Sequence, residues 1–138
     1  MLSIIIASHG KFADGIKQSA EMIFGQQENV SSVTFMPDEG PDDLIKKYND
    51  ALESFGSDAS VLFLVDLWGG SPFNAASRIV AEHTDHMALL TGLNLPMLIE
   101  AYASRSMSLD EIVPHLEETA KDGVKHLELV EDQGDDLL

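Results

Sequence analysis

The sequence predicts an α/β fold with a mostly parallel, flavodoxin-like open sheet of strand order 2-1-3-4 and helices on both faces. Three observations predict it. Short apolar, β-branched runs alternate with segments of helical spacing, so that strand and helix follow one another four times. The runs at 2–7 and 61–65 are unbroken, which is typical of strands buried on both faces. The length of 138 residues suits one domain with a core of its own.

The first half of the chain is predicted to contain two strands and two helices. The strands are residues 2–7 and residues 30–36. The helix between them closes at Gly25. A second helix opens at Gly40-Pro41, with proline in its first position and acidic residues in its first turn, and Gly56 ends it. The residues expected on the inner faces of these helices are Ala13, Ile16, Ala20, Ile23, Phe24, Leu44, Ile45, Tyr48 and Leu52.

The second half repeats this alternation. Residues 61–65 (VLFLV) are the clearest buried strand, and residues 87–90 form the next one. Between them Ser71 is predicted to be a helix N-cap and Pro72 the first helical residue. The inner face of that helix is expected to hold Phe73, Ala76, Ile79 and Val80.

The last part of the chain is predicted to hold two helices and one strand. A short helix begins at 94–96 and runs to about Ser104. Ser108 and Glu111 form a capping box for the final helix. Residues 124–130 (VKHLELV) alternate in polarity and are predicted to be an antiparallel edge strand. We expect it to cover the open edge of the sheet, within one subunit or by exchange with a second copy.

The composition limits the classes of partner and compartment. The net charge is −16, from 24 acidic and 8 basic residues, which disfavours nucleic acid and anionic membranes as partners. The chain has no cysteine, so disulfides and thiolate metal sites are excluded. The apolar run at the start is too short to span a bilayer and lacks the features of a signal peptide. We therefore expect a cytoplasmic protein.

The acidic residues are spread along the chain and gather again at its end. We interpret residues 1–130 as one domain and residues 131–138 (EDQGDDLL) as an acidic tail that is predicted to be disordered. A solubilising surface is the simplest interpretation of this charge. Steering of partners that present a basic face is the alternative.

Two loops are predicted to meet at the point where the sheet reverses its winding. In open α/β sheets, ligands bind beyond the carboxyl ends of the strands at this point. Ser8-His9-Gly10 follows the first strand, and residues 66–72 (DLWGGSP) follow the third. If those strands are neighbours, His9 and Asp66 stand side by side and Ser71 faces them at a helix N-terminus.

These residue types fit the transfer of a phosphoryl group to histidine. A carboxylate such as Asp66 fixes the imidazole tautomer of His9 and leaves the other ring nitrogen as a nucleophile. Helix N-terminal amides and the Ser71 hydroxyl can stabilise the charge on the phosphoryl oxygens. Gly69 and Gly70 allow backbone amides to approach a phosphate closely. Each feature taken alone has an ordinary structural interpretation, and it is their convergence on one crevice that favours a site.

Other functions remain open at this point. His9, Asp66 and Ser71 are the residue types of a serine hydrolase, although GGSPF does not match the G-x-S-x-G nucleophile elbow. A non-catalytic binding module is a further alternative, which an intact His9 and Asp66 disfavour. The histidines of 83–86 (HTDH) lack a fourth ligand in a known pattern, so we predict no metal site there.

Two segments, IIIASHG near the start and FLVDLWGGSPFNAASR in the middle, give the sequence a family resemblance. It resembles the IIA components of the mannose/fructose/sorbose class of the bacterial sugar phosphotransferase system, over nearly the whole chain. The resemblance implies that His9 carries the phosphoryl group, that Asp66 hydrogen-bonds it and that Ser71 lies near the phosphate. Relatives often have threonine at Ser8 and other residues at Lys11-Phe12, and these departures bear on partner contacts.

The resemblance also implies partners. The phosphoryl group comes from the histidine-containing phosphocarrier HPr and passes to a IIB component, with no metal or organic cofactor. Members of this family pair as homodimers by exchanging the last strand, and no IIB domain follows Leu138, so a free-standing IIA component is expected. The phosphocarrier of dihydroxyacetone kinase is a second candidate within this class, but it lacks the WGGSP loop.

Overall fold

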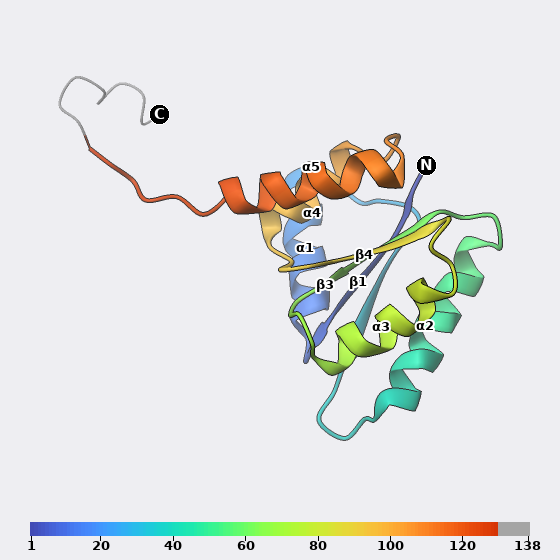
Figure 1. Cartoon of the computed structure of the whole chain (residues 1–138). Coiled ribbons are helices and arrows are strands. Elements are labelled where there is room, and N and C mark those ends of the chain that lie inside the picture. Colours follow the sequence, from blue (N-terminus) through green and yellow to red (C-terminus); the bar gives the residue numbers. More distant parts are fainter. Residues whose placement is uncertain (130–138) are drawn as a thin grey trace.

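The computed structural model describes residues 1–129, and it confirms the predicted sheet. Four parallel strands lie in the order β2-β1-β3-β4 (Figure 1). Their bounds are β1 Ser3–His9, β2 Val30–Phe35, β3 Val61–Val65 and β4 Met87–Thr91. Because β1 and β3 are adjacent and parallel, their carboxyl ends lie side by side.

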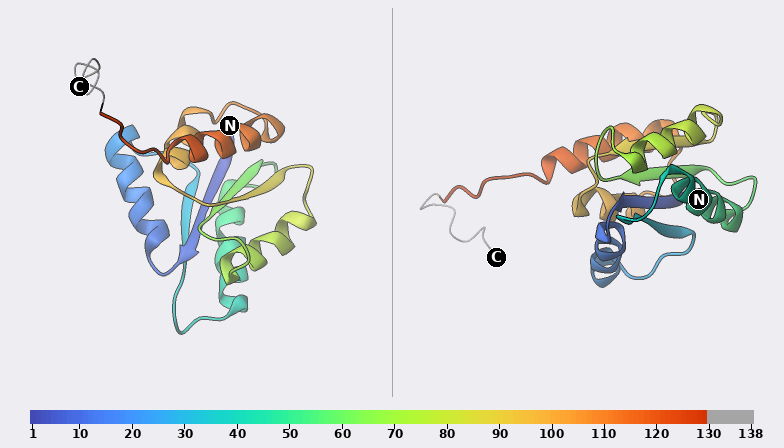
Figure 2. Two further views of the ribbon diagram at one scale, coloured as in Figure 1. Left: turned by 60° about the vertical axis from the view of Figure 1, so that its left-hand side comes forward. Right: turned by 90° about the horizontal axis from the view of Figure 1, so that it is seen from below.

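Five helices cover the two faces of the sheet. They are α1 Phe12–Phe24, α2 Pro41–Phe55, α3 Ser71–Ala81, α4 Leu95–Ala103 and α5 Leu109–Asp122. One core layer lies between the sheet and α1, α4 and α5, and the other between the sheet and α2 and α3 (Figures 1 and 2). In the described residues no helix is both long and apolar enough to cross a membrane.

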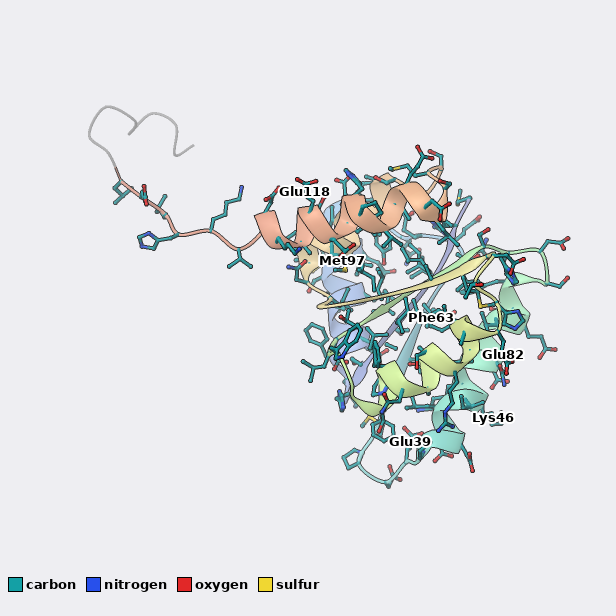
Figure 3. All side chains as sticks on the ribbon, viewed as in Figure 1. Glu39, Lys46, Phe63, Glu82, Met97 and Glu118 are labelled. Atoms are coloured by element: carbon teal, nitrogen blue, oxygen red, sulfur yellow. The ribbon has the colours of Figure 1, made fainter. Side chains whose placement is uncertain are left out.

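Successive strand residues supply the two layers in turn. Ile4 and Ile6 of β1 face α1, α4 and α5, whereas Ile5 and Ala7 face α2 and α3. Figure 3 shows Phe63 inside the molecule, while Lys46 lies on the outer side of α2. The alternation explains why the runs read as unbroken in the sequence, since both faces of each strand are covered.

Most of the predicted helix ends are confirmed. Gly25 and Gly56 follow α1 and α2 with φ of 97° and 96°, and Pro41 is the first residue of α2. The side chain of Asn94 accepts a hydrogen bond from the Met97 amide at 3.0 Å and caps α4. The predicted capping box precedes α5, where the Glu111 amide donates to Ser108 Oγ at 3.3 Å.

Two residues predicted on the inner face of α1 are exposed instead. Ala13, Ile16 and Ala20 are buried as expected, but Ile23 is 61% and Phe24 43% exposed. The Phe24 ring contacts Tyr102 of α4, with ring centroids 6.0 Å apart. Ile23 stands at the margin of the inner face, where no element of the described chain covers it. A helical pattern alone does not locate this margin.

The predicted final strand at 124–130 is not formed. Residues 124–129 carry no strand and lead away from the body beyond α5 (Figures 1 and 2). Val124, Leu127 and Leu129 are all largely exposed. A strand needs a neighbouring strand for its backbone hydrogen bonds, and among residues 1–129 this segment has only the bond from the Val124 amide to the Lys121 carbonyl, at 3.2 Å. Val130 and the tail predicted at 131–138 lie outside the described residues.

Arg105 joins the start of the sheet to the loop before β2, a role that the sequence does not signal. Its side chain is buried. Nε donates to the Leu2 carbonyl at 2.9 Å, Nη1 to that of Glu28 at 2.7 Å and Nη2 to that of Asn29 at 3.3 Å. Burial lowers the pKa of Arg105. The guanidinium therefore supplies side-chain donors to the Leu2 and Glu28 carbonyls, and it adds a second donor to the Asn29 carbonyl, which also accepts the Ile4 amide at 3.0 Å.

Replacing Arg105 should destabilise the fold. Arg105→Met keeps the apolar stem but removes the guanidinium donors from the buried Leu2 carbonyl and the part-buried Glu28 carbonyl, so we expect the free energy of unfolding to fall by about 2–3 kcal/mol. Urea denaturation monitored by circular dichroism measures this loss. The control is Lys46→Met, which removes only the exposed ion pair with Asp50 and should cost less than about 1 kcal/mol. Equal losses for the two variants would contradict the assigned role.

Candidate functional site

The candidate site lies at the carboxyl ends of the two central strands. His9 is the last residue of β1, and Asp66 directly follows β3. The register pairs Ala7 with Val65, and the Asp66 amide donates to the Ala7 carbonyl at 3.2 Å. The sheet order thus brings together two residues that are 57 positions apart in the sequence.

A hydrogen-bond network fixes the His9 ring. Nδ1 of His9 lies 2.9 Å from Oδ2 of Asp66, and the same oxygen accepts the His9 backbone amide at 2.9 Å. The other carboxylate oxygen accepts the Leu67 amide at 2.9 Å. An ionised carboxylate only accepts hydrogen bonds, so Nδ1 carries the proton and Nε2 keeps a free lone pair. The His9 side chain is 45% exposed and that of Asp66 is 15% exposed. The ring therefore reaches solvent while the carboxylate that holds it is mostly covered.

Gly70 lies against the other side of the ring. A Cβ atom at this position would be 2.6 Å from Cε1 of His9 and 3.0 Å from Nε2. The φ of Gly70 is −80°, which any residue adopts, so the contact rather than the backbone angle requires glycine here. Gly69 is the opposite case, because its φ is +85° and nothing lies within 4 Å of its missing Cβ.

Helix α3 begins at this contact, one residue earlier than predicted. Gly70 is its N-cap and Ser71 its first residue, so Ser71 is not the cap that the sequence predicted. The Ser71 hydroxyl does not cap the helix, and within residues 1–129 it makes no hydrogen bond. The amides of Gly70 and Ser71 likewise have no acceptor within the described chain. Unpaired donors at a helix N-terminus, together with the helix dipole, favour an anion.

Phe35 at the end of β2 and the turn at Gly10 border the site on the side of β2. The Phe35 ring meets the His9 ring edge-on at 6.1 Å. The Gly10 amide donates to the Phe35 carbonyl at 2.8 Å. Ser8 Oγ accepts the Ala13 amide at 2.7 Å and so supports the first turn of α1. The sequence analysis did not predict a contact between Phe35 and His9. The one feature that could have indicated it is the position of Phe35 at the end of the strand that pairs with β1.

The geometry bears on the alternative chemistries. Among the described residues Ser71 makes no hydrogen bond to His9, so the serine–histidine contact of a hydrolase is not formed. At the HTDH segment, Nδ1 of His86 is 2.9 Å from Asp85 and the His83 ring lies against His86 at 5.2 Å. Residues 1–129 contain no group of three or more side chains that could hold a metal ion.

The fold and the site define a small α/β domain that presents one oriented histidine at the switch point of a parallel sheet. A family model described as "PTS system fructose IIA component" matches residues 3–117. The chain therefore belongs to this family of IIA components of the phosphotransferase system.

Curated relatives support this assignment. The chain is 46% identical over 128 residues to the mannose-specific EIIAB component of Escherichia coli, covering 91% of this chain and 39% of that protein. The chain thus spans about two-fifths of that relative's length. It is 37% identical to the fructose-specific EIIA component of Bacillus subtilis, over 99% of this chain and 96% of the relative.

Solved structures are similar as well. The EIIA component from Streptococcus agalactiae superposes with a TM-score of 0.84 at 36% identity, covering 91% of this chain and 97% of that one. The mannose/sorbose-specific IIA subunit from Enterococcus faecalis gives 0.86 at 29% identity, covering 94% and 97%.

The two glycines should respond differently to alanine. In Gly70→Ala the new methyl group collides with the His9 ring, so the Nδ1 contact with Asp66 should lengthen and the ring nitrogen signals of His9 should shift in NMR spectra. Gly69→Ala meets no side chain, so it should leave those signals unchanged while its left-handed backbone costs about 1 kcal/mol of stability. Unchanged His9 signals in Gly70→Ala would show that the ring does not depend on this contact.

Proposed function

We propose that the protein is a phosphocarrier that accepts a phosphoryl group on Nε2 of His9 from phospho-HPr and passes it to a IIB component. The observation that carries this proposal is the pairing of Nδ1 with Asp66, which leaves Nε2 beside the N-terminus of α3. Residues 1–130 form the carrier domain, and the protein works in the cytoplasm. The transferred group serves the uptake and phosphorylation of a sugar.

The transfer is an in-line exchange between two nitrogen atoms. The lone pair of Nε2 forms a bond to phosphorus, and the bond between phosphorus and the donor histidine breaks, its electron pair returning to the donor ring. Phosphorylation leaves the His9 ring positively charged while Nδ1 keeps its proton, and the carboxylate of Asp66 stabilises that charge. The reverse exchange delivers the group to the next carrier.

The N-terminus of α3 stabilises the phosphoryl oxygens. The amides of Gly70 and Ser71 and the Ser71 hydroxyl are the donors, and Gly69 provides the turn that brings them to the ring. Donors aimed at charge that develops in the transition state each contribute about 10²-fold or more to a rate. No cofactor is needed for this chemistry, because the phosphoryl group arrives already activated on the donor.

Exposed apolar side chains around His9 provide the surface on which partners dock. Phe12, Leu67 and Trp68 are all exposed. Trp68 keeps 79% of its surface in solvent, although its ring contacts Phe73 in a tilted arrangement with centroids 4.5 Å apart. A large loop ring that packs on the following helix yet faces solvent is typical of a contact residue. HPr and the IIB component use this surface in turn, because both must bring their residue to the same Nε2.

His9 should be the only phosphorylated residue. Incubation with phosphoenolpyruvate, enzyme I and HPr should add one acid-labile, base-stable phosphoryl group, detected by mass spectrometry. His9→Ala should accept none and remain folded, because the change lies at an exposed strand end. His115→Ala is the matched control and should be phosphorylated normally, since His115 pairs with Glu100 on α4, away from the site. A phosphorylated His9→Ala protein would refute the proposal.

The segment at 124–129 supports a homodimer built by strand exchange. Among residues 1–129, its apolar side chains Val124, Leu127 and Leu129 are largely exposed, and the outer edge of β4 is unpaired. Beside this edge lies a groove of about 500 Å³ that Trp68, Leu89, Leu90, Met97 and Val113 help to line. The same segment of a second copy, added antiparallel to β4, satisfies the backbone of both.

Two truncations should distinguish the contribution of residues 124–129 to dimerisation from that of residues 131–138. Removing all residues after Gly123 should yield monomers or aggregates, because the exchanged strand is lost and the β4 edge is left open. Removing only residues 131–138 should leave the dimer intact. Light scattering at micromolar concentration measures both, and a monomeric full-length chain would contradict strand exchange.

A further inference from the structure

Tyr48 is a core residue whose hydroxyl group the core itself does not need. It lies on the inner face of α2, where its neighbours in the helix, Leu44 and Ala51, are apolar. The whole side chain is buried, and its ring packs edge-on against Phe63 of β3 at 5.4 Å and 89°. A phenylalanine would make the same ring contacts without carrying a polar atom into the core.

The hydroxyl makes one contact, and that contact leads to the candidate site. It donates a hydrogen bond of 2.8 Å to the carbonyl of Pro72, the second residue of α3. The first turn of α3 also contains Ser71 and follows the N-cap Gly70, which touches the His9 ring. Tyr48 therefore connects β3, which leads into Asp66, with the helix end that faces Nε2 (Figure 3 shows the position of Phe63).

A second buried tyrosine shows that burial of a tyrosine in this protein does not by itself give its hydroxyl a hydrogen-bond partner. Tyr102, in the opposite core layer, is also buried, yet its hydroxyl has no partner within the described residues. Burial raises the pKa of Tyr102 to about 12. Burial also raises the pKa of Tyr48, and the negative charge of Asp66 raises it further, so its hydroxyl stays protonated as a donor.

We propose that Tyr48 is a positioning residue for phosphoryl transfer. Its hydroxyl holds the N-terminus of α3 in the position relative to the His9 ring at which Gly70 and Ser71 face Nε2. This proposal rests on the proposed function. Gly70 approaches the ring so closely that this position is critical. A small displacement of the helix end changes both the space around Nε2 and the direction of the amide N–H groups. Tyr48 is too deep to touch a partner protein, so it acts on the transfer step and not on docking.

The test compares Tyr48→Phe with Tyr102→Phe, which makes the same chemical change in the other layer. For transfer from phospho-HPr, Tyr48→Phe should lower kcat by about fivefold or more, because misplacing reacting groups slows a reaction steeply. Its KM for phospho-HPr should stay within about twofold of wild type, because a buried residue contributes nothing to docking. Tyr102→Phe should leave both constants unchanged. A wild-type kcat in Tyr48→Phe, or a rise in KM alone, would overturn the proposal.

Two spectroscopic measurements separate this proposal from the proposed function. The amide signals of Gly70 and Ser71 should shift in Tyr48→Phe and stay in place in Tyr102→Phe, whether or not His9 is ever phosphorylated. In the wild-type protein the Tyr48 hydroxyl proton should exchange slowly and give a resolved signal, a test that holds even if Tyr48→Phe does not fold. If wild-type protein accepts no phosphoryl group but these signals behave as expected, the proposed function fails and the positioning of α3 by Tyr48 stands. Unshifted amides, or a rapidly exchanging hydroxyl proton, refute the positioning role.

Discussion

The hydrogen bond between His9 Nδ1 and Asp66 is the interaction on which the site depends. It exists because β1 and β3 are adjacent and parallel, so that their carboxyl ends, and the residues there, face the same edge of the sheet. One carboxylate oxygen accepts both the ring and the backbone amide of His9, which fixes the tautomer and the ring direction together. The other oxygen is held by Leu67, so the carboxylate cannot turn away.

Charge explains why the other side of the ring has to be a helix N-terminus. The protein has a net charge of −16, and in the proposed function a phosphoryl group on His9 adds further negative charge. Lysine and arginine are scarce, and no cationic side chain is hydrogen-bonded to His9 or Asp66 in the described residues. Backbone amides supply positive potential without an added basic residue, and they keep their direction because α3 is packed on the sheet.

Sequence reasoning reached the parts of this arrangement that follow from topology and residue type. His9 and Asp66 could be paired because strand alternation predicts the sheet order, and the order predicts which strand ends meet. The requirement for glycine at position 70 could not be derived, since it comes from contact with a ring 61 positions earlier in the sequence. The contacts of Arg105 and the exposure of Ile23 were missed for the same reason: each is decided by which distant element lies beside it. The final strand was predicted from a pattern that needs a neighbouring strand, and residues 1–129 do not supply one.

The exposure of the site is consistent with a carrier and not with an enzyme that closes over a small substrate. A site that hydrolyses or isomerises a metabolite gains from excluding water around the reacting atoms. A carrier must instead offer the same nitrogen to two different proteins, each of which brings the other half of the transition state. His9 at the end of β1, with a half-exposed ring held by a partly buried carboxylate, meets that requirement. In the proposed function this chain supplies the fixed half of the reaction centre, and a partner that docks over Leu67 and Trp68 excludes water from it.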